Sequence, residues 1–337
     1  MNIKQIAKAA GVSVATVSRV MNHPETVAPK TREKIERVMK EAEYKPNWFA
    51  QGLNFNKTKT IGIVIPHMLH SSYMEIAGGV EEVARMKGYI TFMCNVEKDK
   101  KMEREYISQL IMRRVDGIIL MFSSLDEQYL AQIESEKVPV VLIGENQENS
   151  KACSVKVDCR DGAGEMIAHL LEVGHRSIGF LCGNDPQQEA KEMLTGYRNI
   201  LKASGLRADE DMILRTENSI EGGYISTKKL IATKLPDAIF ATSDEIAYGA
   251  IDALKDSGYK VPDDVAVAGF GNNRMSNLIE PKLTTVELPF RKMGIYAARI
   301  LFDLIDGESR DDKQILLRPR MRIRKSCGHK ERIGEMF

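Results

Sequence analysis

The sequence of 337 residues lacks the features that would place it in several other classes of protein. It has no run of 18 uninterrupted apolar residues, so we expect no transmembrane helix and no membrane partner. Its first residues show neither the apolar core nor the cleavage site of a secretory signal, and its five cysteines include no CxxC pair. These absences predict a cytoplasmic protein whose thiols stay reduced.

Catalytic motifs are absent as well. The chain contains no GxxxxGK[ST] phosphate loop, no HExxH zinc motif and no GxSxG nucleophile turn. The six histidines are scattered; His67 and His70 lie three residues apart, but no cysteine or carboxylate is placed with them to complete a metal site. We therefore expect neither an enzyme nor a bound metal or other cofactor.

Charge is distributed unevenly along a chain whose formal net charge is only +1. Residues 1–60 hold 11 Lys and Arg against 5 Asp and Glu, whereas residues 61–337 hold 37 against 42. The apolar content of 43% is typical of a globular protein, and the length suits two or three domains. A basic N-terminal module on a mildly acidic body predicts that one end of the protein binds a polyanion.

The first 20 residues have the pattern of two short helices joined by a turn. Asn2 can cap the first helix, and Gly11 can end it in the left-handed conformation. Ser13 can cap the second helix, whose Val17 and Val20 face the core. The apolar face of the first helix is formed by Ile3, Ile6, Ala7 and Ala10. This arrangement predicts a DNA-binding helix-turn-helix.

The outward face of the second helix carries small, polar or basic side chains, which suit a DNA groove better than a protein core. A third helix is expected over residues 27–42, with Pro29 in its first turn. Its core stripe is formed by Ile35, Val38, Met39 and Ala42.

The order of these residues resembles the N-terminus of the LacI/GalR family of bacterial repressors. The matching residues are Gly11-Val12-Ser13, Ala15-Thr16-Val17-Ser18-Arg19-Val20, Asn22, Val27, Pro29, Thr31-Arg32 and Tyr44-Lys45-Pro46-Asn47. Two positions depart from the family, because Ala28 stands where a Ser or Thr cap is usual and Glu43 where Gly usually ends the helix. The resemblance implies a DNA-binding surface formed by Ser13, Val14, Ala15, Thr16, Ser18, Arg19, Asn22, Thr31, Asn47, Ala50, Gln51 and Leu53.

The resemblance also implies that residues 47–53 form a hinge helix whose Leu53 wedges into the minor groove. A helix this short is marginal in water, and Gly52 weakens it further, so its order should depend on DNA and on a partner hinge. The alternative is that Trp48, Phe49 and Leu53 pack on the body. The predicted domains are the helix-turn-helix at 1–46, the hinge and linker at 47–59, and an effector-binding and dimerisation domain at 60–337.

Beyond the linker, strand-like apolar runs alternate with helical patterns, which predicts an α/β body with parallel sheets. The expected strands are 60–65, 89–94, 116–121, 138–143, 177–182, 237–241 and 264–269. The expected helices are 74–87, 101–113, 126–136, 161–174, 189–204, 222–232, 244–257 and 290–306. So many units suggest two lobes, and their order resembles the periplasmic-binding-protein-like body of the same family. That body implies crossings near 157–161, 289 and 319, with lobe 1 at about 60–158 and 290–318 and lobe 2 at about 159–289 and 319–330.

The carboxyl ends of the strands in both lobes would face a shared cleft, where ligands bind in open α/β folds. By resemblance, the expected effector-binding residues are His67, His70, Ser72, Tyr73, Gln187, Met193, Asn218, Ser243, Asp244, Asn272 and Asn273. The pattern of sugar-binding relatives is incomplete, because Met193 stands where they carry Arg and Gly271 where they carry Asp. A polyol is best held by such a charged, bidentate pair, so we expect a less sugar-like effector.

Three hypotheses follow. The first is a repressor that binds a palindromic operator as a homodimer and is controlled by a small-molecule effector, a sugar or related metabolite. The second keeps the DNA-binding regulator but replaces that effector by a protein partner, such as a phosphorylated carrier protein, and leaves the cleft vestigial. The third is a sugar receptor or sugar enzyme with a fortuitous N-terminus, against which the missing signal and catalytic residues argue. Residues 325–337 contain no heptad run, so we expect no tail-driven tetramer.

Overall fold

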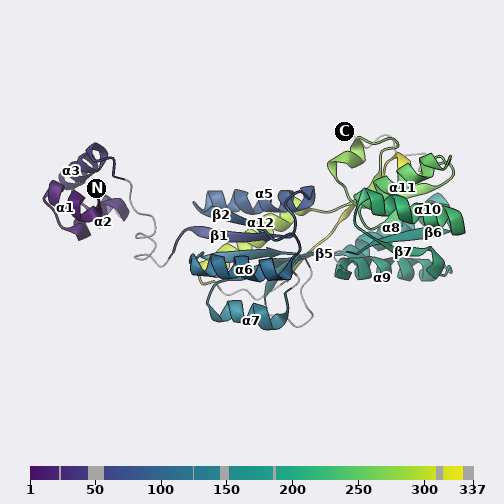
Figure 1. The fold of residues 1–337 in the computed structure, drawn as a ribbon, viewed down its shortest axis with the longest axis horizontal. Helices are drawn as coiled ribbons and strands as arrows, with labels where there is room; N and C mark the ends of the chain where they lie inside the picture. Colours follow the sequence, from purple (N-terminus) through teal and green to yellow (C-terminus); the bar gives the residue numbers. More distant parts are fainter. Residues whose placement is uncertain are drawn as a thin grey trace. The chain divides into compact units, whose positions relative to one another are not determined.

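The computed structural model describes residues 1–22, 24–44, 57–123, 125–144, 152–184, 187–308 and 314–328. The chain divides into two compact units, Met1–Lys59 and Thr60–Phe337 (Figure 1). The first unit is helical, and the second contains two six-stranded sheets covered by helices. The predicted fold class, a helical headpiece followed by a two-lobed α/β body, is confirmed.

The headpiece consists of α1 (Ile3–Ala10), α2 (Val14–Asn22), a short 3-10 turn (Pro24–Thr26) and α3 (Pro29–Glu41). The Asn2 side chain accepts a hydrogen bond from the Gln5 backbone at 3.0 Å, and the Gln5 side chain accepts one from the Asn2 backbone at 2.8 Å. This reciprocal capping box fixes the start of α1. Gly11 ends α1 with a φ of +63°, as the sequence predicted. The shared core consists of Ile6, Ala7, Ala10, Val17, Val20 and Ile35.

Both unusual positions of α3 are visible in the backbone. Ala28 occupies the N-cap position but offers no side-chain hydrogen bond, and Pro29 begins the helix. Glu43 adopts a φ of +46°, the left-handed conformation that glycine adopts without steric cost. The Tyr44 backbone nevertheless bonds back to the Met39 carbonyl at 2.9 Å, so the helix end keeps the usual pattern despite the strained residue.

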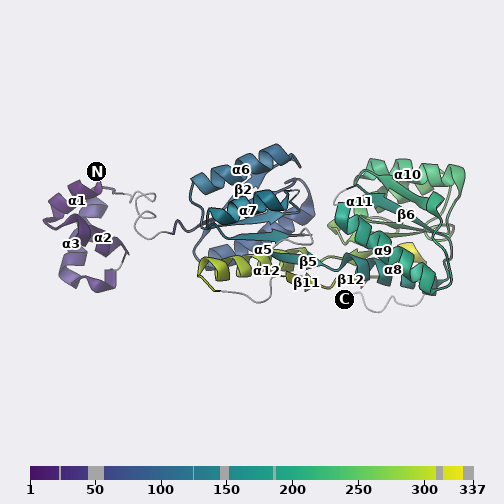
Figure 2. The same cartoon turned by 90° about the horizontal axis from the view of Figure 1, so that it is seen from below.

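Lobe 1 is built on the sheet order β11-β5-β4-β3-β1-β2, and every pairing in it is parallel. Its strands are β1 (Thr60–Ile65), β2 (Ile90–Asn95), β3 (Gly117–Met121), β4 (Val140–Ile143), β5 (Cys153–Val157) and β11 (Gln314–Leu317). Its helices are α5 (Ser71–Met86), α6 (Lys100–Met112), α7 (Glu127–Ser135) and α12 (Phe290–Ile305). Figures 1 and 2 show α5 and α12 on one face of this sheet and α6 and α7 on the other.

Lobe 2 repeats the plan with the order β12-β10-β9-β8-β6-β7, in which β10 and β12 form an antiparallel pair. Its strands are β6 (Ile178–Gly183), β7 (Ile213–Thr216), β8 (Ala238–Ala241), β9 (Ala266–Gly271), β10 (Thr284–Glu287) and β12 (Arg320–Arg322). Its helices are α8 (Cys159–Val173), α9 (Gln187–Ala203), α10 (Ile220–Thr233) and α11 (Asp244–Asp256). The pairs α8–α9 and α10–α11 cover opposite faces (Figure 2).

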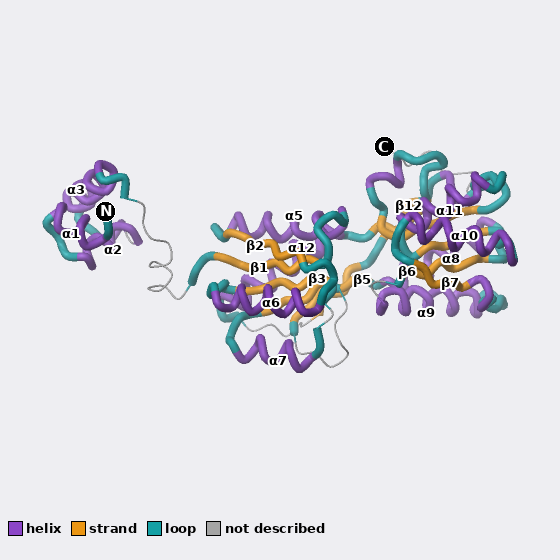
Figure 3. The backbone as a smooth tube through the Cα atoms, in the orientation of Figure 1, coloured by secondary structure: helices purple, strands orange, loops and turns teal. Residues whose placement is uncertain are grey.

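Three segments carry the chain between the lobes (Figure 3). They join β5 to α8, β10 to α12, and β11 to β12. Three additional 3-10 turns lie at Glu210–Met212, Arg274–Asn277 and Lys325–Cys327. The strands and helices expected in the body all exist, with ends within about three residues of their predicted positions. The short strands β5, β7, β10, β11 and β12 were not predicted.

Glycines let the helices that border the cleft pack closely. A Cβ at Gly79 of α5 would lie 2.2 Å from the Arg291 carbonyl oxygen, and one at Gly294 of α12 would lie 2.0 Å from the Ile76 carbonyl oxygen. Contacts this short exclude any side chain, so the α5–α12 pair is held at backbone-to-backbone distance. The first turns of these two helices supply residues to the cleft described below.

Candidate functional site

The recognition face of the headpiece lies on α2. Ser13 caps this helix, because its Oγ accepts a hydrogen bond from the Thr16 backbone at 3.1 Å and lies 2.8 Å from Thr16 Oγ1. Val17 and Val20 are buried under α2. The opposite face is open, and even the apolar Val14 is 40% exposed. An exposed apolar residue beside small polar groups suits contact with base edges and thymine methyl groups.

The described DNA-binding candidates share this face or lie at the start of α3. Ser13, Val14, Ala15 and Arg19 are exposed, whereas Thr16, Ser18 and Thr31 are partly buried. Asn22 ends α2, but its side chain lies outside the described residues, as do Asn47, Ala50, Gln51 and Leu53. The hinge prediction for residues 47–53 therefore stays a prediction from the sequence.

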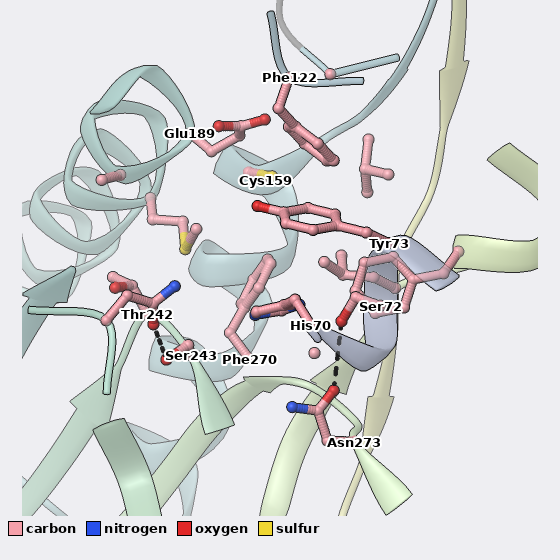
Figure 4. A pocket seen from close by; sticks show the side chains of 18 of the residues that line it. His70, Ser72, Tyr73, Phe122, Cys159, Glu189, Thr242, Ser243, Phe270 and Asn273 are labelled. Carbon is pink, nitrogen blue, oxygen red and sulfur yellow. Dashed lines mark hydrogen bonds between the residues drawn. The ribbon is translucent and has the colours of Figure 1, made fainter. Parts of the chain in front are cut away.

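A second candidate site is a cavity of about 100 Å³ between the two lobes of the body (Figure 4). One set of lining residues is apolar: Tyr73, Phe122, Val157, Ala190, Met193, Phe270, Leu288, Phe290 and Met293. The remaining lining residues are His70, Ser72, Gly144, Lys156, Cys159, Glu189, Asn218, Thr242, Ser243, Glu245, Gly271 and Asn273. Both lobes and the segments that connect them thus contribute to one mixed apolar and polar site.

The first turn of α5 and the loop before it form the lobe 1 wall. The ring of Tyr73 lies between two other rings, with its centroid 4.6 Å from that of His70 and 5.3 Å from that of Phe122. Burial, together with the nearby Lys98 and His67, lowers the pKa of His70. The imidazole is therefore neutral at pH 7.

The N-terminus of α11 forms much of the lobe 2 wall. Ser243 caps α11 through the Ile246 backbone at 3.3 Å, and its hydroxyl also donates to the Asn218 side chain. The Asn273 amide donates to Glu245 Oε1 at 2.7 Å. These bonds hold the polar groups of the cleft in one arrangement.

Two contacts join the lobes directly across the cavity. Ser72 Oγ donates to Asn273 Oδ1 at 3.5 Å, a contact drawn in Figure 4. His70 Nε2 lies 4.0 Å from Glu245 Oε1. Both contacts pair the start of α5 with groups around α11, so any movement of one lobe relative to the other must break or remake them.

Asp244 holds parts of lobe 2 together through buried hydrogen bonds. It is fully buried and accepts hydrogen bonds from the Asn273 backbone at 2.6 Å, from Ser276 Oγ at 2.8 Å and from the Thr285 hydroxyl. Burial, only partly offset by these bonds, raises the pKa of Asp244 to about 6. It is not a lining residue of the cavity, and it acts on the site by fixing the loop that carries Asn273.

Two further effector candidates, His67 and Asn272, lie away from the cavity lining. His67 Nε2 is 3.3 Å from Glu97 Oε2 on the exposed side of the loop. The Asn272 side chain is held by Arg324 at 2.7 Å and by Glu287 at 3.2 Å. The side chain of Gln187 lies outside the described residues. The cavity therefore brings together seven of the eleven sequence candidates: His70, Ser72, Tyr73, Met193, Asn218, Ser243 and Asn273.

Sequence reasoning missed most of the apolar wall and three charged residues. Phe122 directly follows β3, and Phe270 is the penultimate residue of β9. Both would have been found by considering every residue at the carboxyl end of a predicted strand. The charged residues are Lys156, Glu189 and Glu245. Nothing in the local sequence distinguishes Glu189 from the other acidic residues that favour the first turn of a helix.

Two absences in the described part of the chain bear on other classes of function. No helix there is long and apolar enough to cross a membrane. No group of three or more histidine, cysteine or acidic side chains is arranged there to hold a metal ion.

A helix-turn-helix joined to a two-lobed α/β body with a central cavity defines a class of protein, the DNA-binding regulators with a ligand-binding-type domain. Comparison with family models agrees: residues 2–47 match the bacterial regulatory proteins of the lacI family, and residues 167–327 match the periplasmic binding protein-like domain. The chain belongs to the LacI family of bacterial transcriptional regulators and is not an enzyme.

The relatives cover nearly the whole chain. Catabolite control protein A of Staphylococcus xylosus is 33% identical over 324 residues, which are 96% of this chain and 98% of that protein. The HTH-type transcriptional regulator DegA of Bacillus subtilis is 35% identical over 327 residues, which are 96% of this chain and 97% of that protein. The lac repressor dimer bound to operator and the anti-inducer ONPF has a TM-score of 0.85 and 26% identity, and the match covers 97% of this chain and 99% of that chain.

Proposed function

We propose that this regulator represses transcription by binding a pseudo-palindromic operator as a homodimer, and that a small molecule in the interlobe cavity sets its operator affinity. The observation that carries the proposal is the cavity itself. Its lining is drawn from both lobes, and two cross-lobe contacts close over it. A ligand there has different contacts in open and closed arrangements, which is the requirement for coupling to a distant site.

The dimer is supported by an unusual edge strand. Among the described residues β2 ends its sheet and pairs only with β1, yet Ile90, Phe92 and Met93 on it are 60%, 40% and 43% exposed. Met86, at the end of the adjoining α5, is 81% exposed. Edge strands of monomeric proteins are usually protected by charges, and exposed apolar patches mark association surfaces. The proposed occupant of this β2 surface is a second copy of the chain, since two-fold symmetry matches a palindromic site.

The route of coupling is proposed to run through the hinge. The hinges of the two protomers, residues 47–53 of each, can be helical over the minor groove only when lobe 1 of each protomer holds them at the right spacing. Movement of the lobes changes that spacing. A coupling free energy of about 1–3 kcal/mol suffices for regulation. The ligand acts as a corepressor if it favours the DNA-competent spacing and as an inducer if it opposes it.

One observation favours a second candidate, control by a protein partner. The charged pair that holds sugar hydroxyls is absent, because Met193 is buried in the wall and Gly271 ends β9. A regulator of this kind would bind its operator in the same way and keep the cleft without a ligand.

A thermal-shift screen separates the two candidates. Dialysed protein is heated with each member of a metabolite panel, and a ligand at 100 times its Kd is expected to stabilise the folded state by about 2.7 kcal/mol. The hit is then tested on Asn218→Ala, which alters the cavity lining, and on the exposed Asn277→Ala as the matched control. The proposal requires weaker binding to Asn218→Ala alone and a change in operator affinity when the hit is added. No hit, or a hit that leaves operator affinity unchanged, contradicts it.

A further inference from the structure

The charges of the interlobe cavity point to a particular class of ligand. Two carboxylates, Glu189 and Glu245, belong to its lining, and Figure 4 shows that of Glu189 directed toward the cavity. Glu189 is only 8% exposed, and the Glu245 side chain is 27% exposed. The lining contains one lysine, Lys156, and the lowered pKa of His70 favours its neutral form. The lining is therefore net acidic, and none of its described residues is an arginine.

The remaining polar groups are largely engaged with one another. Ser243 donates to Asn218, Thr242 accepts from the Gly183 backbone at 2.8 Å, and Asn273 donates to Glu245. A neutral polyol needs many oriented donors and acceptors, and it gains little from a site whose hydroxyls and amides already bond internally. The donors suited to anions are equally few.

Aromatic rings supply the complementary surface. Tyr73 and Phe122 line the cavity from lobe 1, Phe270 lines it from lobe 2, and Phe290 stands where the chain returns to lobe 1. The faces of such rings attract cations, and more strongly when water is excluded. Burial raises the pKa of Glu245, and a cation bound beside it would favour the charged carboxylate.

We propose that the effector carries a protonated amine on a compact, partly apolar body, with the ammonium group attracted by the acidic lining to which Glu189 and Glu245 contribute and the body packed against the rings. This inference rests on the proposed small-molecule control and names the ligand class of the same cavity. The chemistry distinguishes a cationic amine from the neutral sugar that the family resemblance suggests. Lys156 opposes the ammonium group, so its charge should weaken binding.

The test uses matched pairs of probes on the dialysed full-length protein at about pH 6.5, where primary amines are protonated. The pairs are cyclohexylamine with cyclohexanol and glucosamine with glucose. The amine of each pair is expected to raise the unfolding temperature and its neutral partner to have no effect, because only the amine can pair with a buried carboxylate. Direct titration by calorimetry then gives the affinity of the better amine.

Four variants assign the effect to the cavity. Glu189→Gln and Glu245→Gln should each weaken amine binding by about tenfold or more, since bonds to charged partners are the strong ones. Lys156→Met should tighten it, and Glu221→Gln on the exposed face of α10 should leave it unchanged. Stabilisation by glucose or cyclohexanol but not by the amines would overturn the cationic class and keep small-molecule control. Absence of any shift with the amines, or equal effects of Glu189→Gln and Glu221→Gln, would overturn the inference itself.

Discussion

Arg19 is the exposed cation on the outward face of α2, beside Val14, Ala15 and Ser18. We expect Arg19→Ala to reduce affinity for the operator more than for random DNA, because base-edge contacts specify whereas phosphate contacts only position. The loss of a bidentate base contact costs about 1–3 kcal/mol. Fluorescence anisotropy with operator and with random duplex measures both affinities. The control is Arg37→Ala on the exposed side of α3, which removes the same charge. If Arg19→Ala lowers the affinity for both DNAs by the same factor, Arg19 is a phosphate contact.

Asp244 gives lobe 2 a pH dependence of known sign. Its pKa in the folded protein is about 6, above the ordinary value of 3.8, so the folded state binds the proton more tightly than the unfolded state. Its contribution to stability is therefore full below about pH 4 and is lost as the pH rises through 6. The loss is of the order of 3 kcal/mol, from a shift of about two pKa units at 1.36 kcal/mol each.

Asp244→Asn isolates this contribution. The amide oxygen can still accept from the Asn273 backbone and from Ser276, while its nitrogen donates to the Thr285 hydroxyl. Urea unfolding between about pH 4 and 7 should show a falling free energy of unfolding in the parent and a flatter profile in the variant. Superimposable profiles would mean that Asp244 is ionised at the same pH in both states.

At the scale of single elements, the start of α3 lacks a side-chain cap, and one substitution should supply it. The Ala28 backbone is non-helical at the N-cap position, with φ −53° and ψ 135°, so a serine there can accept from the Thr31 backbone. Ala28→Ser should stabilise the start of α3 by about 1 kcal/mol. Native-state hydrogen exchange of the first amides of α3 reports the gain. Ala9→Ser, an exposed position inside α1, is the control and should bring no gain; unchanged protection in Ala28→Ser would show that the cap geometry is wrong.

The sequence predicted the elements that have their own periodicity or caps. α1 has a capping box and a terminal glycine, and β1 is an apolar run buried at every position. The strands it did not predict are three to five residues long and mix polar with apolar residues, as in the Arg-Met-Arg of β12. Such segments become strands because a neighbouring strand pairs with them, a tertiary cause that local patterns do not carry.

The same limit applied to the cavity. His70, Ser72 and Tyr73 were found because they follow the first strand of the body, where ligands gather in this type of fold. Glu189 and Lys156 were not, because their place in the lining depends on how α9 and β5 meet across the interlobe crossing. Asp244 was grouped with the cleft by its neighbour Ser243, although its side chain turns into lobe 2.

At the scale of the whole molecule, the β2 surface is expected to hold the dimer together. Phe92→Asp should convert the dimer to a monomer at micromolar concentration, because each protomer then places one charge in an apolar interface. Burying an unpaired polar group costs more than ~2 kcal/mol, and a two-fold interface would bury two such groups. Sedimentation equilibrium measures the association. Met112→Asp introduces the same charge at an apolar residue of α6 that is 66% exposed, and it should leave the dimer intact. A monomeric parent would contradict the proposed dimer, and a dimeric Phe92→Asp would place the interface elsewhere.

The central claim is that two copies of this chain read one two-fold symmetric DNA site through α2. The most direct test is selection of randomised DNA duplexes by the full-length protein, followed by sequencing of the bound pool and sedimentation of the protein on the selected duplex. We predict a pseudo-palindromic consensus with two protomers on each duplex, and loss of the consensus at the bases contacted by Arg19 when the selection is repeated with Arg19→Ala. An asymmetric consensus bound by one protomer, or a pool with no enriched sequence, would contradict the account.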